Sequence, residues 1–335
     1  MNGYDAVLVL SFGGPEGPDD VMAFLDNVTR GRGVPRARLE EVASRYMDLG
    51  GVSPINEQCR RLIDALRVEL SEHHIDLPIY WGNRNWHPMI ADTVGEMTRD
   101  GVKNALAITT SAYSSYSSCR QYLEDIEAAR SVVGKSAPRI DKIRAYYDHP
   151  GFIKPFAAAT RLALSRLGDL EREAHLVFTA HSIPTAMAGQ CQYENQIAEA
   201  ASLVAARQTA SHEWSIAWQS RSGSPRVPWL EPDVNDHLRR LRDRGIRGAT
   251  IVPIGFVSDH FEVLFDLDKE ASATAAAIGL AITRAAAPGT SPEPEFVAMW
   301  RQLIEERLSG DSPRLGIGSL EPIGDACQVG CCPPG

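Results

Sequence analysis

The sequence lacks any run that approaches the ~18 apolar residues of a membrane span,. Its first residues, Met1–Phe12, lack the basic region and small-residue cleavage site of a secretory signal peptide, and their apolar character predicts a first strand instead,. We therefore expect a cytoplasmic protein. The sequence also lacks a net positive charge, since the net charge is −9, and this argues against a nucleic-acid partner, which usually needs an extended basic surface,.

Repeats of solenoid length and the phosphate-binding motifs are missing as well,. The GGPEG turn near the start resembles a glycine-rich loop, but neither GxGxxG nor a P-loop is present, so a nucleotide-binding enzyme is disfavoured,. What is present is typical of a globular protein: 335 residues, 44% of them hydrophobic and 23% charged,. This length predicts two domains or one large α/β unit.

Eight apolar runs alternate with stretches of helical period, which predicts an α/β fold with parallel sheets covered by helices on both faces. Eight strands fit either one barrel or two four-stranded Rossmann-like halves. The polar stretch Gly168–Ala174 divides the strands evenly. We place domains at 1–168 and 169–288, followed at 289–335 by a helix and a cysteine-rich tail.

Two segments carry candidate chemistry. The run LVFTAHSIP ends a strand at His181, and ligands of open α/β sheets bind at strand carboxyl ends,. In the segment from Ile251 to Ala271, Glu262, Asp266 and Glu270 recur every four residues, so an α-helix would align them in one acidic stripe ~12 Å long,. A carbonyl-bound histidine and a solvated helix face are the plain alternatives. The apolar neighbours of the stripe favour burial, and buried carboxylates need partners or a function.

Seven motifs in order make the argument specific. They are LSFGGPE (Leu10–Glu16), GGVSPIN (Gly50–Asn56), YWGNRNWHP (Tyr80–Pro88), YSSYSSCRQY (Tyr113–Tyr122), FTAHSIP (Phe178–Pro184), WQSRSGSPRVPWLEP (Trp218–Pro232) and GFVSDHFEVLFD (Gly255–Asp266). This set, spread from about Val7 to Glu270, resembles the ferrochelatase family, whose members insert Fe²⁺ into a free porphyrin.

The resemblance implies two Rossmann-like, chelatase-type domains, each with a four-stranded parallel sheet, and a porphyrin cleft between them. It implies that the final helix, before the cysteine-rich tail, returns toward the N-terminal domain. It also implies that His181 and Glu262 form the metal-site pair, which we expect to face each other across the macrocycle. Asp266 and Glu270 would form an outer acidic line.

The family pattern also assigns the porphyrin surroundings. Ser53 and Tyr122 match positions that contact porphyrin in related bacterial enzymes, and Arg30 falls in the region that meets the propionates. Several soluble relatives carry a tyrosine in the first strand–helix turn that can ligate product iron, and this chain has Phe12 there. Because phenylalanine cannot ligate iron, His181 remains the candidate for coordinating the product.

The chemistry of insertion suits these side chains. Two pyrrole protons and the waters of Fe²⁺ must leave. A neutral imidazole is both a ligand for Fe²⁺ and a base near neutral pH, and a carboxylate in an apolar site has a raised proton affinity. Which of His181 and Glu262 takes metal and which takes protons stays open at this point. A two-ligand site also suits metal in transit better than a closed four-ligand cage.

Five arginines crowd the segment after the first predicted helix. They are Arg30, Arg32, Arg36, Arg38 and Arg45. Arginine binds carboxylates in a bidentate fork, although a solvated helix face with Glu40 and Glu41 as partners is the plain alternative. In membrane-associated members of the family the corresponding rim is apolar. The charged rim here favours coproporphyrin III, a tetracarboxylate, over protoporphyrin IX, which stays the alternative.

Three of six cysteines lie in the last nine residues, at Cys327, Cys331 and Cys332. A subset of ferrochelatases carries a [2Fe–2S] cluster, and the resemblance assigns it here to these three and Cys119, which makes the Cys₄ set that such clusters use. Free thiols and a structural zinc are the alternatives. Cys59 is expected to pack in a helix, and Cys191 receives no role.

Two rival functions remain. Chelatases that load cobalt or nickel use more histidines at the metal site, and here only His260 accompanies His181; we expect it on another side of the helix from Glu262. The other rival is a haem or iron carrier without catalysis, whose function Glu262→Gln would leave intact.

We further expect a monomer with no integral membrane contact, which makes at most transient contact with a downstream haem-pathway enzyme.

Overall fold

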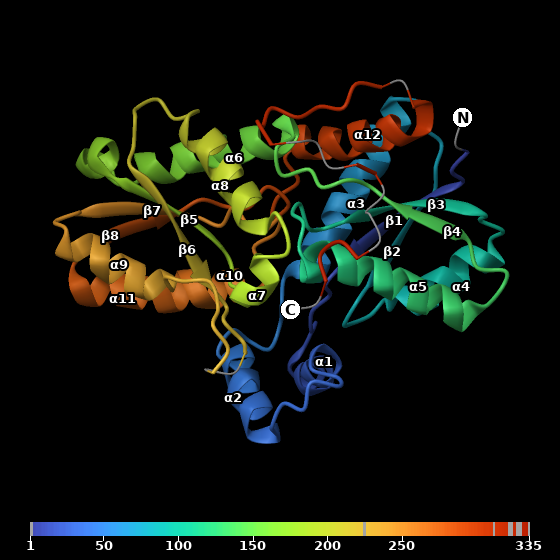
Figure 1. Cartoon of the computed structure of the whole chain (residues 1–335), viewed down its shortest axis with the longest axis horizontal. Coiled ribbons are helices and arrows are strands. Elements are labelled where there is room, and N and C mark those ends of the chain that lie inside the picture. Colours follow the sequence, from blue (N-terminus) through green and yellow to red (C-terminus); the bar gives the residue numbers. More distant parts are fainter. Residues whose placement is uncertain (1–2, 224–225, 311, 321–323, 326–329, 334–335) are drawn as a thin grey trace. The chain divides into compact units, whose positions relative to one another are not determined.

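The computed structural model describes residues 3–223, 226–310, 312–320, 324–325 and 330–333 (Figure 1). Contacts divide the chain into two compact units. Unit 1 comprises 1–110, 121–143 and 300–313, and unit 2 comprises 111–120, 144–299 and 314–335. Each unit is built around its own four-stranded parallel sheet.

The sheet of unit 1 has the order β2-β1-β3-β4. Its strands are β1 (Ala6–Ser11), β2 (Ile79–Asn83), β3 (Asn104–Thr109) and β4 (Arg139–Lys142). Strand β1 is buried along its whole length, as expected for the centre of a sheet covered on both faces,. The helices of this unit are η1 (Pro18–Asp20), α1 (Val21–Val28), α2 (Arg36–Met47), α3 (Ile55–Glu72), α4 (Ile90–Arg99) and α5 (Gln121–Val133).

The sheet of unit 2 repeats this plan with the order β6-β5-β7-β8. Its strands are β5 (His175–His181), β6 (Trp214–Gln219), β7 (Gly248–Val252) and β8 (Ala281–Arg284). Its helices are η2 (Tyr116–Arg120), α6 (Pro150–Ser165), η3 (Gly168–Glu173), α7 (Thr185–Ala188), α8 (Tyr193–Ala205), α9 (Val234–Asp243), α10 (Phe261–Val263), η4 (Leu264–Ala271) and α11 (Ser272–Ile278). The last helix, α12 (Pro294–Ser309), begins in unit 2 and continues into unit 1.

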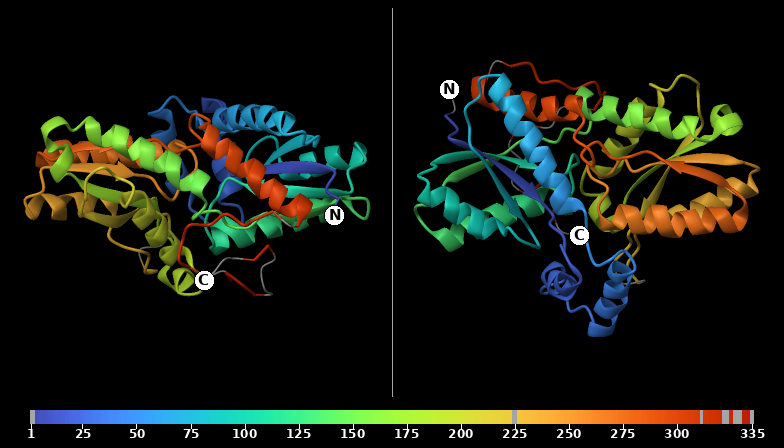
Figure 2. Two further views of the ribbon diagram at one scale, coloured as in Figure 1. Left: turned by 90° about the horizontal axis from the view of Figure 1, so that it is seen from above. Right: turned by 180° about the vertical axis from the view of Figure 1, so that it is seen from behind.

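Helices flank both faces of each sheet (Figure 2), which confirms the predicted α/β class with two four-stranded parallel sheets. In the described part of the chain, no helix is both long and apolar enough to cross a membrane.

The contact-defined units differ from the predicted boundaries at 168 and 288. Helix α6 precedes residue 168, yet it belongs to unit 2 because it packs against α8, β7 and β8. The segment 111–120 also belongs to unit 2, since the hydroxyl of Tyr113 donates to the carbonyl of Ile254 at 2.7 Å and Gln196 Oε1 accepts from Ser114 N at 2.8 Å. The predicted strand allotment, four before residue 168 and four after it, agrees with the two sheets.

A row of small apolar residues fixes the helix that carries the candidate carboxylates. Val263, Leu267, Ala271 and Ala275 recur every four residues and lie in the core cluster of unit 2, each at most 1% exposed. Because this row is buried in the core, it fixes the rotation of the helix about its axis and with it the side on which the carboxylates lie. The carboxylates, each one position earlier in sequence, therefore lie along the edge of this buried row.

Candidate functional site: an imidazole and a carboxylate at the end of a central strand

His181 is the last residue of β5, which lies between β6 and β7 inside its sheet. The strand ends here because Pro184, three residues on, cannot continue the hydrogen-bonded ladder. The side chain is 33% exposed, and its Nδ1 lies 2.5 Å from the carbonyl oxygen of Ser182. A nitrogen that faces a carbonyl donates, so Nε2 keeps its lone pair. From α8, the Tyr193 hydroxyl donates to the carbonyl of His181 at 3.1 Å and fixes its backbone.

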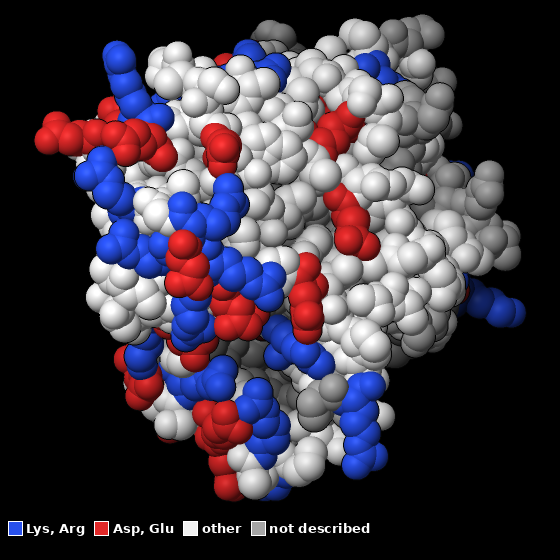
Figure 3. Space-filling model, turned by 60° about the vertical axis from the view of Figure 1, so that its left-hand side comes forward, with Lys and Arg blue, Asp and Glu red and all other residues white. Residues whose placement is uncertain are grey.

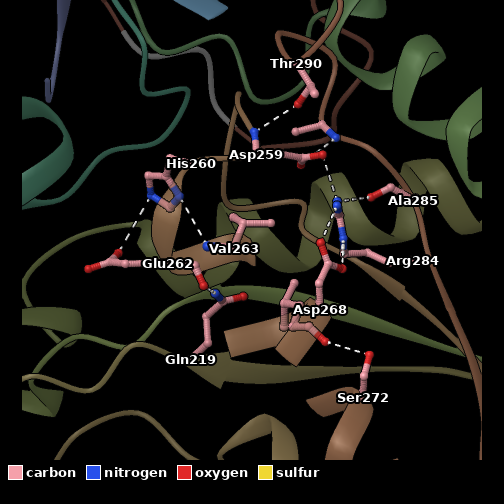
Figure 4. Close-up of polar contacts among 12 residues, drawn as sticks. Gln219, Asp259, His260, Glu262, Val263, Asp268, Ser272, Arg284, Ala285 and Thr290 are labelled. Atoms are coloured by element: carbon pink, nitrogen blue, oxygen red, sulfur yellow. Dashed lines mark hydrogen bonds and ion pairs between the residues drawn. The ribbon is translucent and has the colours of Figure 1, made fainter. Parts of the chain in front are cut away.

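His260 caps the helix that follows β7. Its Nδ1 accepts a hydrogen bond from Val263 N at 3.3 Å, so in the neutral ring the proton is on Nε2 (Figure 4),. Burial lowers the pKa of His260, which favours this neutral form,. The ring packs against Phe256 in a tilted arrangement, with centroids 5.0 Å apart.

Glu262 Oε2 lies between the two imidazoles, 3.9 Å from Nε2 of His181 and 3.7 Å from Nε2 of His260. The expectation that His260 turns away from Glu262 is therefore wrong, because a residue at the N-cap is not yet on the helical wheel. The pairing of His181 with Glu262 was predicted, and the structure brings these side chains together.

The same distance bears on the expected arrangement across a macrocycle. A flat ring makes van der Waals contact at about 3.5 Å on each face, so groups on opposite faces stand about 7 Å apart. His181 Nε2 and Glu262 Oε2 are 3.9 Å apart, which leaves no room for a ring between them. In this structure the two side chains point toward each other directly, and they do not lie on opposite sides of a space that could hold the macrocycle.

The acidic stripe, Glu262, Asp266 and Glu270, lies mostly on a π-helix, η4, instead of the predicted α-helix. Because a π-helix has more residues per turn, positions four apart still fall on one side. Asp266 Oδ2 accepts from the Ser220 hydroxyl at 2.5 Å and from Gln219 Nε2 at 3.3 Å.

Asp266 holds its proton unusually tightly. Burial, and then the charges of Glu262 and Glu270, raise its pKa to about 7, against the opposing effect of the Ser220 and Gln219 hydrogen bonds,. A carboxyl with this pKa exchanges a proton readily at neutral pH. The charges of Glu262 and Glu270 both act on Asp266, so the three carboxyl groups lie near one another, and their role as an outer acidic line stays a prediction.

Gln219 and Ser220 were not predicted as site residues. Gln219 ends β6 and is the register partner of His181, so it reaches the same edge of the sheet. Ser220 has a φ of +60°, a conformation uncommon outside glycine,. The position of QSRSGS after an apolar run was a signal that these residues lie at a strand end, but not that they bond Asp266.

The residues predicted to contact porphyrin lie in unit 1. Phe12 is half-buried and makes an edge contact with Phe24, whose ring also meets Tyr46 and Trp86. Ser53 is 5% exposed.

Tyr122 is a core residue. It is 5% exposed, packs among the strands and α4, and has the guanidinium of Arg84 4.0 Å from its ring centroid. Its predicted porphyrin contact finds no support in this position, because almost none of the ring is accessible. The motif match alone did not indicate that the side chain points into the core.

The five arginines divide into two groups. Arg36, Arg38 and Arg45 form ion pairs with carboxylates on or near α2, which is the plain alternative considered for them. Arg30 donates to the amide oxygen of Asn27, and neither it nor Arg32 has a carboxylate within salt-bridge distance among the described residues. Figure 3 shows basic and acidic side chains interspersed over much of the face it presents.

Four described cysteines belong to unit 2, and they are near one another. Burial raises the pKa of Cys332, and Cys331, Cys119 and Cys191 raise it further because their thiols are close by. We call these four residues the four-thiol patch. No three His, Cys, Asp or Glu side chains among the described residues are arranged to hold a metal ion, and Cys327 lies outside the described residues. Cys59 is buried in α3, 1% exposed, as predicted.

The sheets and the strand-end imidazole–carboxylate pair define the class as a chelatase-type α/β protein. Two structures of SirB from Bacillus subtilis, one described as a sirohydrochlorin chelatase in complex with cobalt, are similar to this chain with TM-scores of 0.55 and 0.53 and 14% and 12% identity. Each covers 92% of this chain and 99% of its own. At such low identity the likeness shows the fold alone.

The family model for ferrochelatase matches residues 4–308, and the chain belongs to the ferrochelatase family. It is therefore an enzyme of the chelatase class. A coproporphyrin III ferrochelatase of Nocardia farcinica is 54% identical, over 98% of this chain and 97% of that protein. A coproporphyrin III ferrochelatase of Streptomyces griseus is 48% identical, over 98% and 93%. These findings confirm the resemblance described above.

Proposed function

We propose that this enzyme inserts Fe²⁺ into coproporphyrin III to give the iron complex, coprohaem. The observation that carries the proposal is the identity of about half of all positions, over nearly the full chain, to proteins named coproporphyrin III ferrochelatase. Arg30 and Arg32, which lack carboxylate partners among the described residues, support a substrate that brings carboxylates of its own,.

Metal passes through the His181–Glu262 pair in this proposal. The lone pair on His181 Nε2 and the carboxylate of Glu262 face one another at 3.9 Å. Two metal–ligand bonds of about 2.1 Å span at most about 4.2 Å, so one divalent ion bridges this distance. Two ligands hold Fe²⁺ weakly, as transfer to the porphyrin requires. His181, Glu262 and Fe²⁺ as substrate keep the roles that the resemblance assigned.

Protons leave along the acidic stripe. Glu262 is the first acceptor in our proposal, and Asp266, with its pKa near 7, passes each proton toward Glu270,. The Ser220 hydroxyl and the Gln219 amide hold Asp266 in place during this exchange. This assigns the proton path to the carboxylates of the helix and the metal to His181 and Glu262 together.

The test is anaerobic insertion of Fe²⁺ into coproporphyrin III and protoporphyrin IX in parallel, with wild type, His181→Ala and Glu262→Gln. We expect wild type to prefer coproporphyrin III by at least tenfold in kcat/KM and both variants to lose at least 100-fold in kcat. A preference for protoporphyrin IX would overturn the substrate. A wild type that binds porphyrin and iron without inserting the metal would indicate a carrier.

We also propose that the protein holds a [2Fe–2S] cluster through Cys119, Cys331, Cys332 and a fourth thiolate, Cys327. The chemistry of the four-thiol patch supports this, because every neighbour that raises the pKa of Cys332 is itself a thiol,. Cys191, in the same patch, is the competing fourth ligand. Such a cluster supplies a one-electron centre when bound, and no step of metal insertion depends on it here.

Purification without oxygen tests this second proposal. We expect a coloured protein with two iron atoms per chain and the visible spectrum of such a cluster. Cys327→Ser and Cys191→Ser then identify the fourth ligand, since only one of them abolishes the spectrum. A colourless, iron-free wild type would contradict the cluster, and zinc in its place would indicate a structural zinc site.

A further inference from the structure

Arg284, the last residue of β8, binds two carboxylates of the segment that carries the site (Figure 4). Its Nε and Nη2 contact the two oxygens of Asp268 at 2.6 and 2.9 Å in a bidentate fork, and its Nη1 contacts Asp259 Oδ2 at 2.9 Å. Nη1 also donates to the carbonyl of Ala285 at 3.1 Å. The side chain of Arg284 is 18% exposed and that of Asp259 6%, so this contact is largely shielded from water, whereas Asp268 is 41% exposed.

Asp259 is itself fixed on both sides. Its other carboxylate oxygen accepts from Ala287 N at 3.1 Å, and its own amide donates to the Thr290 hydroxyl at 2.9 Å. Arg284 is equally fixed, because its backbone is the register partner of Ile251 in the parallel ladder of β7 and β8. The guanidinium therefore joins Asp268 to Asp259 and to the backbone of β8, both of which are held by other contacts in unit 2.

The two carboxylates bracket the reactive segment. Asp259 directly precedes the capping His260, Asp268 lies on the π-helix, and Glu262 and Asp266 lie between them. A π-helix is rare and occurs mostly as a short bulge within a helix, and here contacts from outside the helix accompany its geometry. One positive charge meets two negative ones here, so the cluster keeps a net negative charge, and Arg284 cannot act by adding positive charge beside Glu262.

We propose that Arg284 is a positioning residue for metal insertion, which holds Glu262 and Asp266 in place by joining Asp259 to Asp268. This inference rests on the proposed function. It predicts that the planar fork, and not the charge, is what matters. A lysine keeps the charge but cannot bridge three oxygen atoms in this geometry.

The experiment compares Arg284→Lys and Asp268→Asn with wild type in anaerobic Fe²⁺ insertion into coproporphyrin III. Porphyrin Kd is measured separately by fluorescence quenching. We expect kcat to fall at least tenfold in Arg284→Lys and at least threefold in Asp268→Asn, with KM and Kd for porphyrin within twofold of wild type. The double variant should lose no more than Arg284→Lys alone, because both changes break one contact.

Arg247→Lys is the matched control. Arg247 forms an ion pair with Glu173 at 2.9 Å in the same unit, but both side chains are mostly exposed and the pair does not involve the segment 259–268. We expect less than a twofold change in kcat. If Arg284→Lys fails to fold, the kcat of Asp268→Asn alone tests the positioning role, because Asp268 is partly exposed and its substitution should leave the fold intact.

The outcomes separate the two proposals. An inactive wild type overturns the proposed function, whatever the variants do. An active wild type with unchanged kcat in Asp268→Asn and Arg284→Lys overturns only the positioning role. A loss that appears equally in kcat and in porphyrin Kd also overturns it, because general damage to the fold would then explain the result.

Discussion

Asp266 remains half protonated at a pH where an exposed aspartate is fully ionised, because burial and two neighbouring carboxylates oppose its charge,. A carboxyl group with a raised pKa destabilises the folded state once it must ionise. The stabilisation present below the unfolded-state pKa near 4 is lost as the pH rises through 7. The same raised pKa that lets Asp266 exchange protons at neutral pH therefore lowers the stability of the folded protein at high pH.

Asp266→Asn should therefore become more stable than wild type as the pH rises. The amide keeps an oxygen for the Ser220 hydroxyl but cannot ionise. We expect the difference in free energy of unfolding to be small at pH 4 and to grow to on the order of 2–4 kcal/mol at pH 8.5. Urea unfolding at several pH values measures this. Parallel curves for the two proteins would show that Asp266 has an ordinary pKa.

Tyr193 offers a second test at this scale, because its hydroxyl donates to the carbonyl of the very residue that carries the imidazole. Tyr193→Phe leaves that buried carbonyl with one donor fewer, and we expect a loss of about 1–2 kcal/mol in the free energy of unfolding. The control is Tyr80→Phe, whose hydroxyl meets Asp100 in an exposed contact and whose loss should cost less than about 0.5 kcal/mol,. Equal losses would refute a special contribution from Tyr193.

Among the elements, most strands were predictable because they are short apolar runs that end in a turn or a proline, whereas β4 has the sequence RIDK. Strand β5 was predicted over Leu176–Ala180 and spans His175–His181. The π-helix was not predictable, because residues four apart share a side in both helix types, and the pattern at Glu262, Asp266 and Glu270 does not distinguish them. Contacts that depend on tertiary folding, such as Arg284 with Asp259, leave no periodic signal at all.

One carboxylate of α8 helps to hold the C-terminal segment after α12, in addition to contacts of Arg144 with Leu315 and of Asp148 with Ile317. Glu199 accepts from the hydroxyl of Ser319 at 2.7 Å and from Leu320 N at 3.1 Å. Glu199→Ala should release this segment without disturbing the sheet. We expect trypsin to cleave after Arg314 at least fivefold faster, at an unchanged Tm.

Glu194→Ala is the control for this prediction, because Glu194 lies five residues earlier on α8, is exposed and forms no hydrogen bond to the described part of the C-terminal segment. Its cleavage rate should equal that of wild type. If Glu199→Ala also behaved like wild type, the carboxylate would not be what holds the segment.

At the scale of the whole molecule, the C-terminal part of α12 is joined by an ion pair to α3 in unit 1. Arg301 contacts Glu69 on α3 at 2.7 Å and Glu305 at 2.7 Å, and its side chain is 13% exposed. Breaking a largely buried pair leaves a charge without its partner. The predicted monomeric state, the cytoplasmic location and the contact with a downstream enzyme stay predictions at this scale.

Arg301→Met should lower the free energy of unfolding by on the order of 2–3 kcal/mol, as measured in urea. Arg67→Met, which removes an exposed pair with Asp64 on the same α3, should cost less than about 1 kcal/mol,. A result in which the two substitutions cost the same would mean that the Arg301 contacts are as solvated as a surface pair.

The chain passes between the two units five times, after residues 110, 120, 143, 299 and 313. No single cut of the gene would therefore yield one intact unit. Proteins of this kind cannot be shuffled by exchanging a front half for a back half, as tandem domains can. Any hybrid with a relative has to inherit the scattered pieces of one unit together, which ties the evolution of distant stretches of the sequence to one another.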